Sequence, residues 1–178
     1  MVVTDHAPMM LSQRIKQLEG NHKMTRQDLS VLLTKEGDDA ELPGDVLGAV
    51  EDVEPFEPGT PEYAKIEQWI EALRSGKFGQ TTNYLYRGRD STVDRSARVG
   101  YCCLGVYCAV VNHAPLTELS GVPMPRQVRF AGSGALVFSD KVADFFAHLN
   151  DSAGFTFKQI ADVAEVLFLD KETAEATV

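Results

Sequence analysis

The chain has 178 residues, and its 17 lysines and arginines against 26 aspartates and glutamates give a formal charge of −9. Hydrophobic residues make up 44% of the chain, which is enough to bury a core and excludes global disorder. No apolar run reaches the roughly 18 residues of a membrane span, and the first ten residues lack the basic start of a secretory signal. Three cysteines, two of them adjacent, do not make a disulfide scaffold, so we expect reduced thiols.

The first 60 residues carry most of the acidic excess, with 12 acidic side chains against 5 basic ones. Apolar spacing predicts short helices over residues 11–19 and 25–33, and a third one that contains Leu47 and Val50. Two short helices and a turn are also typical of a helix-turn-helix motif. A helical hairpin is favoured because an acidic surface repels duplex DNA. The acidic, proline-rich residues 51–60 are predicted to be a linker.

The next helix is predicted to begin with Thr60 as its N-cap and Pro61 at its first position, and to end at Ser75 and Gly76. Its apolar stripe is Ile66, Trp69, Ile70 and Leu73. Residues 84–86 are predicted to form a strand, and residues 87–90 a turn.

The most apolar run covers residues 100–111 and fits a buried helix, although its β-branched and aromatic residues also suit a strand. Residues 122–137 are predicted to form a loop. Ser139 or Asp140 opens a helix with Val142, Phe145, Phe146 and Leu149 on its apolar face, and Asn150 to Gly154 form a turn. Thr156 and Gln159 form a capping box that opens the last helix, which carries Ile160, Val163, Ala164 and Leu167.

These elements predict a mostly helical α+β fold. It has an acidic helical N-terminal region over residues 1–50, the linker 51–60, a compact domain over residues 61–170 and a frayed tail over residues 171–178.

Three motifs resemble those of a family of short phage and prophage proteins, over about residues 66–167. They are LRSGKFGQ (Leu73–Gln80), YCCLGVYC (Tyr101–Cys108), and Leu149-Asn150-Asp151 followed by Gly154-Phe155-Thr156-Phe157 and Ile160-Ala161-Asp162. In that family the motifs usually read LRSGKYxQ, CCLGVxC and LND…G…SF…IAD. The resemblance implies a phage origin, and hence action in the host cytoplasm. Phe78 replaces the usual tyrosine, and Ala109 stands where an acid often follows the last cysteine.

Adjacent cysteines at the start of a helix suggest an activated thiol, because a helix N-terminus stabilises thiolate. A cysteine hydrolase or transferase would use Cys102 or Cys103 with His148 as base, oriented by Asn150 or Asp151. His113 is ten residues beyond Cys103 on the same predicted helix. That is about 15 Å of rise, so it cannot be the base. Core thiols are favoured over this alternative, because cysteine is among the most often buried residues.

No metal site and no cofactor are predicted. Cys103 and Cys108 are five residues apart and point about 140° apart on a helix. No CxxC or HxxxH spacing supports zinc. Residues 132–134 (Gly-Ser-Gly) lack the Lys-Ser/Thr of a phosphate loop.

The strongest binding signal is the basic segment from residue 74 to residue 98, which has six basic residues against two aspartates. Guanidinium groups bind phosphate, aromatic rings stack on bases and amides read base edges. The candidate ligand-binding residues are Arg74, Lys77, Gln80, Tyr84, Arg87, Arg89 and Asn150. The inventory fits a small nucleotide-like anion, an acidic protein partner, or a solvated loop.

The favoured hypothesis is a non-enzymatic phage accessory protein that binds a host factor, such as a defence component, or sequesters a nucleotide-like anion. The cysteine enzyme is one alternative. A minor structural or assembly protein, acting as a homo-oligomer, is the other. No membrane partner and no duplex nucleic acid are expected.

Overall fold

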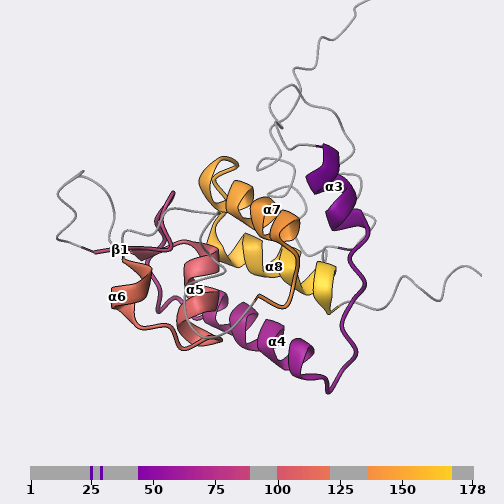
Figure 1. Ribbon diagram of the computed structural model, residues 1–178, viewed down its shortest axis with the longest axis horizontal. Coiled ribbons are helices and arrows are strands. Elements are labelled where there is room, and N and C mark those ends of the chain that lie inside the picture. Colours follow the sequence, from indigo (N-terminus) through magenta and orange to yellow (C-terminus); the bar gives the residue numbers. More distant parts are fainter. Residues whose placement is uncertain (1–24, 26–28, 30–43, 89–99, 121–135, 170–178) are drawn as a thin grey trace, which may run out of the picture.

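The computed structural model describes residues 25, 29, 44–88, 100–120 and 136–169 (Figure 1). Its elements are α3 (Gly44–Glu51), α4 (Pro61–Arg74), β1 (Tyr86–Arg87), β2 (Gly100–Tyr101), α5 (Cys103–Val110), α6 (Leu116–Leu119), α7 (Asp140–Asp151) and α8 (Phe157–Phe168). The described part is mostly helical with one two-stranded antiparallel sheet, which confirms the predicted fold class. None of its helices has the length and apolarity needed to span a bilayer.

Helix α4 forms where its capping residues predict. The Thr60 hydroxyl accepts a hydrogen bond from the backbone N–H of Tyr63 at 3.2 Å, and Pro61 occupies the first turn. Gly76 follows the helix with φ of +69°, a left-handed conformation that glycine adopts without strain. All four residues of the predicted apolar stripe are buried.

The apolar run at residues 100–111 divides into two elements. Gly100 and Tyr101 form β2, and α5 begins at Cys103, so helix and strand are both present in it. The partner strand β1 lies at Tyr86–Arg87, later than the predicted residues 84–86, because Leu85 turns into the core. Tyr86 pairs with Tyr101, and Arg87 pairs with Gly100.

Helices α7 and α8 carry the apolar faces that the sequence predicts. Ser139 caps α7, and the capping box of Thr156 and Gln159 opens α8 with both of its hydrogen bonds formed. The predicted turn at residues 150–154 needs a correction. Asn150 belongs to the last turn of α7, and Gly154, with φ of +67°, supplies the left-handed residue.

Helix α8 lies between α4 and α7 in the fold, and α5 packs on α4 and α7 (Figure 1). The centre of the core is Trp69, whose ring contacts Tyr107 and Phe146 edge-on at centroid distances of 5.6 and 5.1 Å. Its indole N–H donates to the carbonyl of Cys103 at 2.9 Å, so the one buried polar atom of the ring is satisfied.

The predicted helices at residues 11–19 and 25–33 fall outside the described residues, apart from two positions. There the backbone N–H of Leu29 donates to the carbonyl of Thr25, and Leu29 is buried. The third predicted helix is confirmed as α3, which packs on α7. The frayed tail at 171–178 also lies outside the described part, and the domain boundaries stay a prediction.

The residues predicted to be a linker lie against the core. The Phe56 backbone N–H donates to the carbonyl of Phe168 at 2.8 Å, and the two rings stack with their centroids 5.6 Å apart. Residues 51–60 therefore run from α3 to α4 while fixed to the end of α8.

Candidate functional site

Arg74 ends α4 and is bound to α8. One of its guanidinium nitrogens donates to Asp162 at 2.6 Å and to Glu165 at 2.5 Å. Two carboxylates therefore already compete for this guanidinium, and a phosphate would have to displace them. The contact holds two helices together across the surface of the core.

Gln80 and Asn150 meet in a buried polar junction. The Asn150 amide is 2% exposed, and it donates to the carbonyl of Thr81 at 2.9 Å. Its oxygen accepts hydrogen bonds from the Cys103 backbone at 3.2 Å and from the Gln80 amide at 3.1 Å. Gln80 also bonds the backbones of residues 155 and 157. These amides join the loop before β1 to α5, α7 and α8, and their polar groups are used within the fold.

Arg87 differs from Arg74 because it lies on an aromatic ring. Its guanidinium carbon is 5.0 Å from the centroid of Tyr84, a cation–π distance. The Arg87 Nε atom is buried and has no hydrogen-bond acceptor among the described residues. We call Arg87 and Tyr84 the arginine–tyrosine pair.

A second aromatic pair lies on the same ribbon. Tyr86 and Tyr101 are cross-strand partners with ring centroids 4.7 Å apart, and Phe78 meets Tyr101 edge-on at 5.2 Å. Burial, with the nearby charge of Tyr86, raises the pKa of Tyr101. Lys77 is exposed, and Arg89 lies outside the described residues.

All three cysteines are fully buried, which confirms the interior placement that the sequence favours. Burial raises the pKa of every thiol, that of Cys108 to about 12. The Cys102 sulfur accepts a hydrogen bond from the Gly105 backbone at 3.2 Å as the N-cap of α5, and the Cys103 thiol donates to the carbonyl of Phe146 at 3.4 Å. These environments favour the thiol form and leave the sulfur no access to substrate.

The two residues predicted to assist a thiol lie at the end of α7. His148 is half-buried, and burial lowers its pKa. The Asp151 carboxylate accepts hydrogen bonds from the Asn150 amide at 2.7 Å and from the Asn83 backbone at 3.0 Å. Asn83 has φ of +66°, so Asp151 fixes a left-handed turn in the loop before β1. This carboxylate contacts the loop, and no described hydrogen bond joins it to His148.

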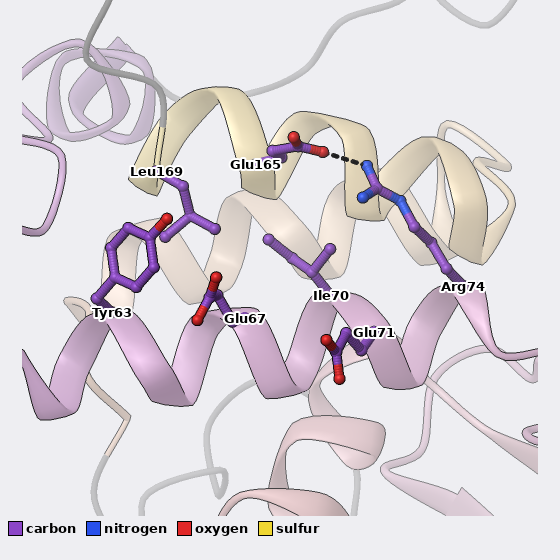
Figure 2. A pocket seen from close by; sticks show the side chains of 7 residues that line it. All are labelled: Tyr63, Glu67, Ile70, Glu71, Arg74, Glu165 and Leu169. Carbon is purple, nitrogen blue, oxygen red and sulfur yellow. Dashed lines mark hydrogen bonds and ion pairs between the residues drawn. The ribbon is translucent and has the colours of Figure 1, made fainter. Parts of the chain in front are cut away.

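A groove of about 330 Å³ lies between α4 and α8 (Figure 2). Its lining residues are Tyr63, Glu67, Ile70, Glu71, Arg74, Glu165 and Leu169. Arg74 stands at one end with its side chain turned to Glu165, and the ring of Tyr63 stands at the other end. In the sequence, Glu67 and Glu71 simply fall outside the apolar stripe of the predicted helix. The groove exists only because α4 packs against α8, and no pattern within either helix predicts that contact.

Among the described residues, no group of three or more His, Cys, Asp or Glu side chains could hold a metal ion. Comparison with protein-family models, curated proteins and solved structures finds no match to this chain.

Proposed function

We propose that this chain is a non-enzymatic accessory protein of the phage type, which binds a nucleotide-like anion in the host cytoplasm. The observation that carries the proposal is the arginine–tyrosine pair, in which Arg87 keeps a buried Nε without an acceptor among the described residues. The motif resemblance supports the phage context.

The contrast between two arginines supports this choice of surface. Arg74 is neutralised by two carboxylates of α8, whereas no described carboxylate pairs with Arg87. Stacking on Tyr84 restricts the Arg87 side chain, so less conformational entropy is lost when an anion binds. Phosphate oxygens suit the planar guanidinium of Arg87, which can bind them in a bidentate way.

The alternative cysteine enzyme gains no support from the described residues. A nucleophilic thiol needs an exposed, stabilised thiolate, and burial disfavours the thiolate of Cys102 and Cys103. An acidic host protein could use the same guanidinium, and that outcome is separated from a nucleotide by the test below.

Titration calorimetry with nucleoside mono-, di- and triphosphates and cyclic dinucleotides tests the proposal. We expect at least one to bind, and Arg87→Gln to weaken it by about tenfold or more, the equivalent of one charge-assisted hydrogen bond. Lys158→Gln removes an exposed positive charge from α8 and should leave affinity within about twofold.

A nucleotide whose affinity falls equally in Arg87→Gln and Lys158→Gln would contradict the assigned surface, because only net charge would then matter. No binding by any nucleotide, with an Arg87-dependent complex recovered from host lysate instead, would replace the nucleotide with a protein partner.

A further inference from the structure

The end of helix α7 holds the backbone turn that leads into Tyr84. We infer that Asp151, the last residue of α7, is a positioning residue for the arginine–tyrosine pair, so that its carboxylate promotes the binding of an anion that its charge alone would oppose. The inference rests on the anion site proposed at Arg87. In this role Asp151 acts through the backbone of Asn83 and not through contact with the ligand.

Two adjacent side chains of α7 hold the loop before β1. The Asn150 amide donates to the carbonyl of Thr81 at 2.9 Å, and the Asp151 carboxylate accepts from the backbone N–H of Asn83 at 3.0 Å. The other oxygen of Asp151 accepts from the Asn150 amide at 2.7 Å. Both carboxylate oxygens are therefore used, and the buried Asn150 ties the contact to the core.

The turn at Asn83 has a backbone conformation that needs support. Its φ of +66° lies in the left-handed region, which asparagine tolerates better than most residues but still adopts at a cost. Asn83 is exposed, so without the carboxylate its N–H bonds to water. The bond to Asp151 is charge-assisted and stronger, so its loss shifts the turn toward other conformations.

Tyr84 lies between two fixed points of the backbone. One is the Asn83 N–H, and the other is Leu85, which is fully buried and whose carbonyl accepts from the Cys102 N–H at 3.1 Å. The Tyr84 ring lies 5.0 Å from the guanidinium carbon of Arg87, which the pairing of β1 with β2 holds in place. A rotation at Asn83 therefore moves the ring away from the guanidinium that it supports.

The sign of the effect separates positioning from charge. Removal of a negative charge from Asp151 should raise the affinity for an anion if only Coulomb attraction matters. If Asp151 positions the pair, its removal frees the Arg87 side chain, which must then be ordered again when the anion binds. The cost of ordering one long side chain corresponds to about a three- to tenfold loss of affinity.

Two variants with the same charge change test the inference by titration calorimetry with the nucleotide that binds the wild type most tightly. Asp151→Ala and Asp151→Asn each remove one negative charge, but only the asparagine keeps an oxygen for the Asn83 N–H. Asp151→Ala should bind about three- to tenfold more weakly than the wild type, and Asp151→Asn should lie closer to the wild type. In a Tyr84→Leu background, Asp151→Ala should change affinity by less than about twofold, because its effect passes through the ring.

NMR measures the arginine–tyrosine pair without any ligand. Protons stacked on an aromatic ring are shifted upfield, and Tyr84→Leu supplies the unstacked values for the side-chain protons of Arg87. Asp151→Ala should move these resonances most of the way to the unstacked values, whereas Asp151→Asn should keep most of the shift. Thr60→Ala, which loses the N-cap of α4, controls for a general loss of stability and should leave the resonances of Arg87 unchanged.

Three results would overturn the inference. They are tighter anion binding by Asp151→Ala, equal affinities of the alanine and asparagine variants, and Arg87 resonances that keep their wild-type positions in Asp151→Ala. If no nucleotide binds the wild type, the proposed function fails by itself. The resonances of Arg87 then decide alone whether Asp151 positions the pair.

Discussion

Among the glycines that the structure describes, Gly105 is the one whose added Cβ atom would come closest to another backbone segment. It is the third residue of α5 and lies against the backbone of Leu85. A Cβ atom built on Gly105 would stand 2.6 Å from the carbonyl carbon of Leu85 and closer still to its oxygen. The obstructing atoms belong to the backbone of Leu85, which cannot rotate away as a side chain can. The change Gly105→Ala must therefore push α5 away from Leu85.

The magnitude follows from opposing terms. In an unobstructed helix the change from glycine to alanine stabilises by about 1 kcal/mol. Here overpacking costs about 1–3 kcal/mol, and the hydrogen bond from the Cys102 N–H to the Leu85 carbonyl, 3.1 Å long, is worth about 1 kcal/mol more if it breaks. We expect a net loss of about 1–3 kcal/mol, a sizeable part of the roughly 5–15 kcal/mol that stabilises a domain.

Urea unfolding measures this loss, with the fluorescence of Trp69, the single tryptophan, as a reporter from the fully buried core. The matched control is Gly48→Ala in α3, where an added Cβ meets nothing within 4 Å. That variant should be unchanged or stabilised by about 0.5–1 kcal/mol. If Gly105→Ala unfolds at the same urea concentration as Gly48→Ala, the close approach of α5 to the Leu85 backbone is wrong.

Three further predictions concern buried polar and ionisable groups. Iodoacetamide at about pH 8 should leave the thiols of the folded protein unlabelled, because burial disfavours the thiolate form. Mass spectrometry should find labelled cysteines only after unfolding, and rapid labelling of the native protein would contradict their burial. Asn150→Ala should cost about 2–4 kcal/mol in urea unfolding because buried partners lose their hydrogen bonds, and a loss below about 1 kcal/mol would mean that the junction closes without it. Burial raises the pKa of Asp151 above its usual 3.8, so the folded protein keeps this proton to higher pH than the unfolded chain. The stability of the wild type relative to Asp151→Asn should therefore fall as the pH rises above 3.8. A stability difference that is constant from about pH 3 to pH 7 would refute the raised pKa.

The sequence predicts well the features that depend on neighbours within one helical turn. Thr60 with Pro61, and Thr156 with Gln159, mark helix starts because a cap needs only a side chain and an N–H two or three residues later. The apolar stripes are readable for the same reason, since helical spacing alone decides which residues share a face.

Contacts between distant segments are not readable in this way. The partners of Arg74 lie 88 and 91 residues further along the chain, and the bond from Gln80 to Asn150 spans 70 residues. From sequence, a helix end and turn explain Asn150 more simply than a ligand contact, although it is also a candidate ligand-binding residue. Only the packing of α7 against the loop before β1 makes it a buried junction.

The arginines show why a functional assignment cannot be made from composition. Arg74 and Arg87 belong to one basic segment, but the fold treats them differently. Arg74 forms ion pairs with two carboxylates of α8, whereas Arg87 lies over the ring of Tyr84. The positive charge that remains for a ligand is therefore smaller than the segment suggests and is displaced toward β1. Because the charge of Arg74 is neutralised by Asp162 and Glu165, the groove between α4 and α8 keeps an excess of carboxylates. Because Arg74 is already ion-paired, reversing the charge at Arg87 should weaken anion binding more than reversing the charge at Arg74.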